Sequence, residues 1–456
     1  MRPTRLMSFD AIVVGGGCAG LSAATALSER GARVLVVEAR PGLGGRASAF
    51  TDPATGERVD NGQHILMGCY QDTLRFLDRI GAADRVTWQS GLKVPMVDRH
   101  GRHSLLSLPA LPTPLNLLAG VLAWDALSWS EKISVLRMGG ASAARNSPAE
   151  TGRCRETVRE WLARNGQAPR LCEMFWEPLA LAALNQSIDR AAAPHFITVF
   201  ERVFGPDPAA AALVLPAVPL DELYAEPARL WLQQRGSDVR VNAPAKVTFD
   251  GGRVRGVRVR DEHITAPIVI STVPWHAFGA LFDEPPPQLS ETIVNATGLA
   301  SLPIVTVNLW LDRVVMHEPL VGLPGRSFQW VFDRRALVGG ATSHLSLVSS
   351  GADAMVGKTN DELTGMAMTE IRDALPAAGT ARLRKAMAVR EKRSTFSLAP
   401  DAPPRPKTRT LIEGFLLAGD WVDTGLPATI ESAVISGHLA AQCAAGTLPH
   451  RRRGVE

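Results

Sequence analysis

Three glycines near the N-terminus have the spacing of a loop that holds a pyrophosphate. Gly15, Gly17 and Gly20 follow an apolar run at residues 9–14 and open an amphipathic helical pattern. In such a loop, one glycine allows a tight turn, one lets phosphate approach N–H groups at a helix N-terminus, and one lets the helix pack on the strand. Glu38 ends the next apolar run, where its carboxylate can accept a hydrogen bond from a ribose 2′-hydroxyl. The pattern predicts a dinucleotide site and disfavours NADP, because the acid would repel its 2′-phosphate.

A second glycine-rich stretch follows this acid directly. It begins at Ala39 and Arg40 and closes with Gly44, Gly45 and Arg46. Backbone N–H groups and a guanidinium both bind phosphate oxygens. We therefore expect the two loops together to hold a long dinucleotide along both of its halves.

Together, the two glycine loops and Glu38 resemble the N-terminal FAD-binding segment of flavin amine oxidases and phytoene-desaturase-type enzymes. The resemblance implies FAD as cofactor, with the acid on the adenosine ribose and the second loop along the pyrophosphate. It also implies that the next segment leads to the isoalloxazine ring. Gly62, Gln63 and His64 are therefore expected to border the flavin, although a lone histidine is more often a structural residue.

Two later segments also resemble parts of these FAD-binding families. Alternating strands surround a turn at residues 250–252, which is typical of a β-hairpin, and the resemblance implies that the backbone of Val247 meets the adenine. Near the end, an apolar strand runs into Gly419 and Asp420, and a last helix follows. In the flavin families this carboxylate lies on the ribityl and pyrophosphate region, and the helix points its N-terminal N–H groups at the pyrimidine edge of the flavin.

The order of these elements predicts an α/β fold. A FAD-binding domain of the Rossmann-like, glutathione-reductase type would be assembled from residues 1–85, 235–275 and 405–456. Residues 86–234 and 276–404 would form a mixed α+β substrate-binding lobe with a helical, apolar part. The expected cofactor-binding residues are Gly15, Gly17, Cys18, Ala19, Gly20, Glu38, Ala39, Arg40, Gly44, Gly45, Arg46, Gly62, Gln63, His64, Val247, Gly419, Asp420, Thr429 and Ile430.

Two proline-containing stretches are uncharged and apolar. Ser104 to Trp124 is long enough to span a bilayer, but Pro109, Pro112 and Pro114 break the helix that a span requires. The stretch fits the core of the second lobe, the wall of a lipophilic tunnel, or a surface that dips into a membrane. Ala209 to Leu220 could form a second part of the same hydrophobic wall.

Few polar residues of the chain are candidates for a role in catalysis. Glu177 lies among aromatic and aliphatic residues in a pattern that predicts a helix over residues 175–185. Burial would raise its pKa and make it a proton donor, although an exposed or helix-capping glutamate explains the same pattern. Glu177, His64 and Asn185 are the residues that we expect to act as the acid or to recognise a hydroxyl group.

Other segments resemble one particular group within this superfamily. Residues 59–70, 176–179, 394–396 and 417–437 are similar to segments of the squalene-associated FAD-dependent desaturases, the hydroxysqualene dehydroxylases of bacterial hopanoid pathways. The implied reaction is reductive: hydroxysqualene loses its hydroxyl group, receives a hydride from reduced FAD and becomes squalene. Such an enzyme needs a dry channel for a long isoprenoid, an acid near the carbinol, and an electron donor that the sequence does not identify.

Two other classes of protein stay open. One works in the oxidative direction on the same FAD scaffold, as a carotenoid-type desaturase or an amine oxidase. An amine oxidase usually needs an aromatic cage, and the two tyrosines, Tyr70 and Tyr224, disfavour a cage built from tyrosine, although tryptophan could substitute. The other class is an isoprenoid-binding flavoprotein without turnover, which the intact FAD pattern disfavours.

The composition of the chain indicates which partners and which cellular location to expect. With 46% hydrophobic and 21% charged residues, the 456-residue chain is typical of a folded protein of two or three lobes. Its net charge of +4 is too small to indicate nucleic-acid binding. The five cysteines lack metal-ligand or redox spacing, so we expect reduced thiols, no metal and a cytoplasmic location. Peripheral contact with the inner face of the cell membrane would use the apolar stretches, aided by Arg451 to Arg453.

Overall fold

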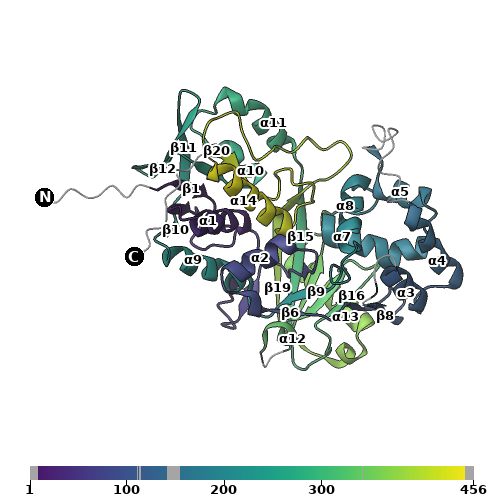
Figure 1. The fold of residues 1–456 in the computed structure, drawn as a ribbon. Coiled ribbons are helices and arrows are strands. Elements are labelled where there is room, and N and C mark those ends of the chain that lie inside the picture. Colours follow the sequence, from purple (N-terminus) through teal and green to yellow (C-terminus); the bar gives the residue numbers. More distant parts are fainter. Residues whose placement is uncertain (1–8, 110, 112–114, 141–154, 341–342, 447–456) are drawn as a thin grey trace.

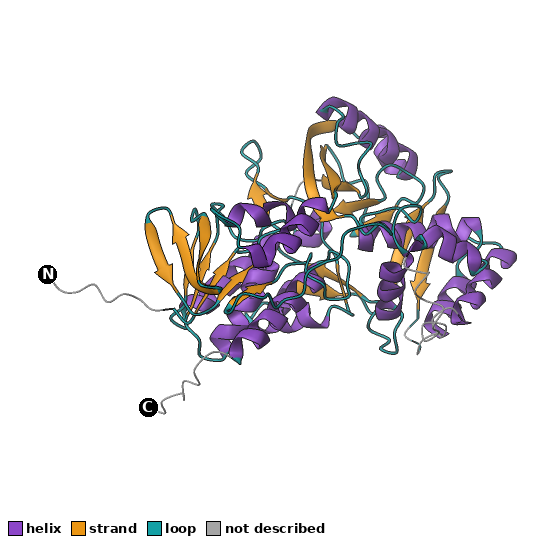
Figure 2. Ribbon diagram, turned by 90° about the horizontal axis from the view of Figure 1, so that it is seen from above, coloured by secondary structure: helices purple, strands orange, loops and turns teal. Residues whose placement is uncertain are grey.

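A parallel sheet with its helices lies at one end of the molecule and a helical lobe at the other, with a large, mostly antiparallel sheet between them (Figure 1). Seen from above, helices gather at the end away from the two termini, and strands and helices are mixed in the rest of the molecule (Figure 2). This computed structural model describes residues 9–109, 111, 115–140, 155–340 and 343–446. Of the residues discussed above, Pro112, Pro114 and Arg451 to Arg453 lie outside these ranges.

The parallel sheet joins segments from both ends and the middle of the chain. Its strands pair in the order β10-β2-β1-β14-β20: Asp238–Arg240, Val34–Val37, Ala11–Val14, Val269–Ser271 and Phe415–Leu417. The two N-terminal strands are buried along their whole length, which explains why they read as continuous apolar runs. Helix α1 (Cys18–Glu29) packs against α14 (Ile430–Ala445) and α9 (Glu226–Gln233). The predicted α/β fold class is confirmed.

A smaller prediction in this region is also confirmed. The predicted hairpin is part of an antiparallel meander of β11 (Ala245–Asp250), β12 (Arg253–Val259) and β13 (Glu262–Thr265). Its turn places Gly251 and Gly252 at φ 57° and 87°, values that favour glycine. Helix α2 (Gln71–Arg79) begins directly after Tyr70. Two short helices follow the meander: α10 (Trp275–Phe278) and α11 (Ser290–Gly298).

The large sheet belongs to the second half of the chain but ends in an early hairpin. Its order is β19-β15-β18-β17-β16-β7-β8: Leu383–Phe396, Ser301–Leu311, Ser343–Ser349, Trp330–Asp333, Leu320–Gly322, Leu92–Val97 and His103–Leu108. Helix α13 (Asn360–Ala374) packs on β15 and β19, and α12 (Arg334–Val338) follows β17. Two small sheets contain β3 (Ala49–Thr51) with β4 (Arg58–Asp60), and β5 (Leu66–Met67) with β9 (Leu213–Pro216) and β6 (Val86–Trp88).

The helical lobe contains α3 (Leu115–Ala123), α4 (Trp129–Ser134), α5 (Val158–Arg164), α6 (Pro169–Leu171), α7 (Glu177–Leu184) and α8 (Ala193–Val203). The helix predicted over residues 175–185 is divided: a π-helix runs from Cys172 to Trp176 before α7 begins. Pro178 has no N–H to continue the ordinary ladder, and the N–H of Glu177 bonds to Cys172 O, five residues earlier.

The two apolar stretches take different places in the fold. Ser104 to Trp124 forms most of β8 and all of α3, and Leu106, Leu117 and Val121 are buried. In the other stretch, β9 is buried along its whole length. Among the described helices, none has the length and apolar character needed to cross a membrane.

Candidate active site

A cavity of about 970 Å³ separates the parallel sheet from the helical lobe and the antiparallel sheet. This volume is at the upper end of the range usual for ligand sites. One side is formed by the glycine loops, by the segment from Asn61 to Ile65 and by the start of α14. The other side is apolar and is formed by Leu92, Val94, Met96, Leu106, Phe175, Leu179, Ala182, Ala183, Ile304, Leu320, Trp330, Phe332 and Val348.

The first glycine loop exposes backbone rather than side chains to the cavity. Gly15, Gly17, Cys18 and Ala19 line it, and α1 begins there without a hydrogen bond from a capping side chain. A Cβ on Gly17 would meet nothing nearer than Gly45 Cα at 3.8 Å, so open space lies in front of this backbone. Gly20 is not part of the lining: its Cβ would be 2.0 Å from Gly15 O, so its role is close packing of helix on loop.

The second glycine loop is fixed to the first. The N–H of Gly44 donates to Gly16 O at 2.8 Å, and the hydroxyl of Tyr224 lies 2.7 Å from the carbonyl oxygens of both Gly44 and Ala47. Glu38 is 8% exposed and accepts from the backbone N–H groups of Gly16 at 2.7 Å and Arg40 at 2.9 Å. A carboxylate has about four acceptor sites, so Glu38 still has lone pairs for a ribose hydroxyl.

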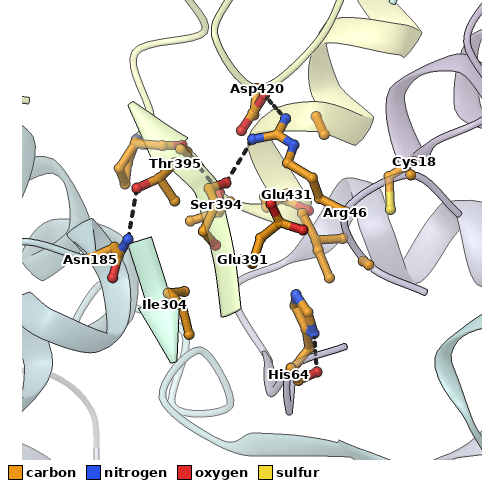
Figure 3. A pocket seen from close by; sticks show the side chains of 18 of the residues that line it. Cys18, Arg46, His64, Asn185, Ile304, Glu391, Ser394, Thr395, Asp420 and Glu431 are labelled. Carbon is orange, nitrogen blue, oxygen red and sulfur yellow. Dashed lines mark hydrogen bonds and ion pairs between the residues drawn. The ribbon is translucent and has the colours of Figure 1, made fainter. Parts of the chain in front are cut away.

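Arg46 connects three distant segments at the centre of the site (Figure 3). Its guanidinium contacts Asp420 Oδ1 at 2.5 Å and donates to Ser394 O at 2.8 Å. Asn61 holds its backbone through a hydrogen bond from Nδ2 to Arg46 O at 2.6 Å. The Gly419-Asp420 strand end, β19 and the second glycine loop therefore meet at one arginine.

The start of α14 closes the same side of the cavity. Thr429 caps the helix by accepting from the N–H of Ser432 at 3.1 Å, and both Thr429 and Ile430 line the cavity. The lining also includes Glu431, which is 1% exposed and accepts from Thr73 Oγ1 at 2.7 Å and from two backbone N–H groups of α2. Burial raises the pKa of Glu431.

These residues fit FAD. The uncapped start of α1 offers N–H groups to a pyrophosphate, Glu38 offers acceptors to a ribose, and Arg46 offers a guanidinium to phosphate oxygens. The start of α14 supplies positive helix-dipole charge on the same cavity. FAD would be held along this wall, where it would supply a group that donates or accepts a hydride.

Val247 is not among the residues that line the cavity. Its side chain is 5% exposed and packs in the core beneath the meander, whereas Ala243, Pro244 and Ala245 line the cavity. The expected contact between the Val247 backbone and the adenine stays a prediction.

His64 lines the cavity together with Gly62 and Gln63. Its Nδ1 lies 2.8 Å from Gly62 O. Burial lowers the pKa of His64, an effect that the backbone contact with Gly62 partly opposes. A neutral imidazole in this position accepts hydrogen bonds through Nε2 and is a poor proton donor.

Asn185 also lines the cavity, but its amide is occupied by the protein. Nδ2 donates to Thr395 Oγ1 at 3.0 Å and lies 3.4 Å from the carbonyl oxygens of Leu302 and Pro303. Oδ1 accepts from the N–H of Gly351 at 2.7 Å. Asn185 therefore ties α7 to β15 and β19, and its expected role in hydroxyl recognition stays a prediction.

Glu177 does not face the main cavity. It lines a separate pocket of about 290 Å³ with Pro178, Arg326 and Gln329, and its carboxylate accepts from the N–H of Ile188 at 3.2 Å. Burial raises its pKa, as the sequence predicted. The helix turns Pro178, Leu179 and Ala182 to the cavity instead. The structure therefore does not bring Glu177 together with His64 on the main cavity, and its role as a proton donor stays a prediction.

Residues 18–445 match the family described as flavin containing amine oxidoreductase. The chain belongs to this family. Its fold is also that of solved structures: an oxidoreductase from Methanosarcina mazei (TM-score 0.74, 15% identity, 95% of this chain and 99% of that one) and a putrescine oxidase bound to putrescine (TM-score 0.69, 16% identity, 96% and 99%). As a family member, the chain is an FAD-dependent oxidoreductase with the predicted FAD-binding α/β fold.

Two curated relatives are similar to this chain over nearly its whole length. The chain is 27% identical to 15-cis-phytoene desaturase of Synechococcus elongatus, over 94% of each chain. It is also 27% identical to hydroxysqualene dehydroxylase of Sinorhizobium fredii, over 95% of this chain and 97% of that one.

Several residues that line the cavity were not among the site residues predicted from the sequence. Glu391 and Thr395 of β19, Arg202 of α8 and Glu431 of α14 line the cavity. An acidic residue in the first turn of the last helix is a signal that could have pointed to Glu431. The others come from segments whose alternation predicts strands or helices without indicating which face meets a ligand.

Proposed function

We propose that this protein catalyses the reductive dehydroxylation of hydroxysqualene to squalene. The observation that carries the proposal is the large apolar cavity that joins the nucleotide-holding loops to the helical lobe. A long isoprenoid needs such a channel, and the full-length similarity to a hydroxysqualene dehydroxylase supports the same substrate class.

The residues of the chain have two tasks in this reaction. Side chains such as Leu106, Phe332 and Val348 exclude water and hold the hydrocarbon. Polar groups on the facing wall orient the carbinol so that the carbon that loses its hydroxyl faces the cofactor. Reduced FAD (FADH₂), when bound, would supply both the hydride and the proton with which the hydroxyl group leaves as water. An external electron donor must reduce FAD between turnovers.

Anaerobic incubation of chemically reduced, FAD-loaded enzyme with hydroxysqualene tests the proposal. We expect squalene in the product analysis and one equivalent of reoxidised flavin per squalene formed. The control incubation replaces hydroxysqualene with squalene and should leave the flavin reduced. Reduced flavin and unchanged hydroxysqualene would overturn the proposal.

A second candidate is an isoprenoid desaturase, which the similarity to 15-cis-phytoene desaturase favours. It predicts the reverse flow of electrons: anaerobic phytoene would reduce the oxidised enzyme. An amine oxidase with a tyrosine cage is less well supported, because Tyr224 is 3% exposed and its hydroxyl contacts the second glycine loop.

We also propose a cytoplasmic enzyme that contacts the inner face of the cell membrane through α3, α4 and the following turn. Their exposed large apolar residues are Leu115, Leu122, Trp129, Ile133 and Leu136, and Trp129 is 70% exposed. Lys132 lies 5.1 Å from the centre of the Trp129 ring and donates from Nζ to Leu122 O at 2.9 Å, so it fixes α4 against the end of α3. The buried strand β9 is excluded from this surface.

Sedimentation with anionic liposomes tests this contact. Trp129→Ser combined with Ile133→Ser should lower the bound fraction several-fold, because both side chains would lose apolar burial in the headgroup region. Leu411→Ser is the control, because Leu411 is 84% exposed but lies in a distant loop. Equal binding by the wild type and the double variant would contradict the proposed surface.

A further inference from the structure

His64 and its neighbour Gln63 present one acceptor and one donor to the cavity. Because Gly62 O can only accept, the 2.8 Å contact requires the proton of the neutral imidazole to be on Nδ1. Nε2 is then an unprotonated acceptor. In Figure 3 the ring of His64 points into the pocket, and Ile304 lies to one side of it.

The amide of Gln63 is oriented by a buried arginine. Nη1 of Arg334 donates to Gln63 Oε1 at 2.8 Å and also contacts Asp60. Arg334 is 3% exposed and Asp60 5%, and the other carboxylate oxygen of Asp60 accepts from the N–H of Leu220 at 3.1 Å. With its oxygen held by Arg334, the amide must point its NH₂ group elsewhere. The described residues form no hydrogen bond with this NH₂ group.

Across the cavity the wall is apolar. Ile304, Leu320 and Phe332 from the antiparallel sheet line it, as does Ile65, the residue after His64. An isolated donor and acceptor on two consecutive residues match the two hydrogen-bonding capacities of one alcohol: its oxygen accepts and its hydrogen is donated.

We infer that Gln63 and His64 together bind the hydroxyl group of an isoprenoid alcohol. Gln63 Nε2 donates to the alcohol oxygen, and His64 Nε2 accepts the alcohol hydrogen. Arg334 is a positioning residue that holds Gln63. This inference rests on the proposed function and adds a specificity: a pure hydrocarbon of equal length leaves both groups unpaired and binds less tightly.

Equilibrium binding to the oxidised, FAD-loaded enzyme tests the pair without turnover. Hydroxysqualene and squalene are titrated in the same detergent and followed by flavin absorbance and tryptophan fluorescence. We expect the wild type to prefer the alcohol by roughly tenfold or more. Gln63→Met and His64→Phe should each bring the ratio of the two affinities close to one while squalene binds at least as well as before.

Two variants control for altered packing. Ile65→Val changes the shape of the same wall but not its polarity, and should shift both affinities equally. Gln63→Glu keeps an oxygen for Arg334 and removes the donor, so the preference should fall even if Gln63→Met does not fold. Arg334→Lys should lower the preference several-fold, a readout that a purely structural role would not move.

An unchanged preference in Gln63→Met, Gln63→Glu and His64→Phe would overturn the inference. So would a shift of the flavin reduction potential in these variants with no change in the ratio, because the pair would then face the flavin. The result is separable from the dehydroxylation test. A selective alcohol site without squalene formation would contradict the proposed reaction alone, and squalene formation with an unchanged ratio would contradict the hydroxyl pair alone.

Discussion

The two sides of the cavity are built from different parts of the polypeptide. On the nucleotide side, backbone atoms of Gly15, Gly17 and Gly45 face the cavity, and the two glycine loops pack backbone to backbone. On the apolar side, the lining consists of apolar side chains such as Phe332 and Leu106 from strands far apart in the sequence. Where backbone packs on backbone, as Gly20 does on Gly15, there is no room for an added Cβ, whereas a side-chain wall can be changed one residue at a time. The first should fail abruptly on mutation and the second gradually.

Gly20→Ala gives the largest effect expected from this difference. An alanine normally stabilises a helix relative to glycine, but here the Cβ would lie 2.0 Å from Gly15 O and would force the loop away from α1. We expect FAD affinity to fall on the order of 100-fold, measured by flavin content and titration. Gly42→Ala is the control, because its Cβ would meet nothing within 4 Å. Full FAD occupancy in Gly20→Ala would contradict the backbone-built site.

Arg46→Met should have the next largest effect. It removes the contact with Asp420 and the bond to Ser394 O, and leaves the 8%-exposed carboxylate without its cation. FAD affinity should fall roughly 30-fold by equilibrium titration. Arg75→Met is the matched control, since its ion pair with Asp72 is on the surface. Equal effects of the two substitutions would show that charge near the site, rather than this junction, holds the cofactor.

Phe332→Ala tests the other side of the comparison. The side chain is 3% exposed, and its loss enlarges the cavity on the apolar wall. We expect about tenfold weaker binding of a long isoprenoid and a free energy of unfolding lower by about 3 kcal/mol, with FAD affinity unchanged. Leu411→Ala, at an 84%-exposed residue, should alter neither quantity. Loss of FAD from Phe332→Ala would mean that the two sides are not independent.

The smallest effect concerns pH and the helical lobe. Burial, aided by the nearby Arg405 guanidinium, lowers the pKa of His195 from 6.5 to about 4. The folded protein therefore favours the neutral imidazole, and this stability is complete above pH 6.5 and is lost as the pH falls toward 4. Denaturant unfolding across this window should show a loss smaller by about 2 kcal/mol in His195→Gln than in the wild type. His103→Gln, at an exposed position, is the control, and parallel losses in all three proteins would place the acid sensitivity elsewhere.

The parallel sheet and the nucleotide loops could be predicted because their signals are local. Val34 to Val37 is apolar throughout since both faces are buried, and Gly20 follows Gly15 at the spacing that helix packing requires. The orientation of the polar side chains around the cavity could not be predicted in the same way. Glu177 has the raised pKa that its apolar neighbours suggested, yet α7 turns it away from the main cavity. Asn185 lies on the cavity, but its amide is bonded to β15, β19 and Gly351.

The sequence by itself predicted a dinucleotide cofactor, the loop expected to hold its phosphates and the acid expected to meet its ribose, because each of these predictions depends on residues within one strand–turn–helix–strand unit. The tertiary structure alone decided which polar side chains face the cavity. Arg334 lies 271 residues from Gln63 and 274 from Asp60, and no local pattern connects them. The orientation of a side chain depends on contacts from every segment packed around it, so it emerges only when those segments meet.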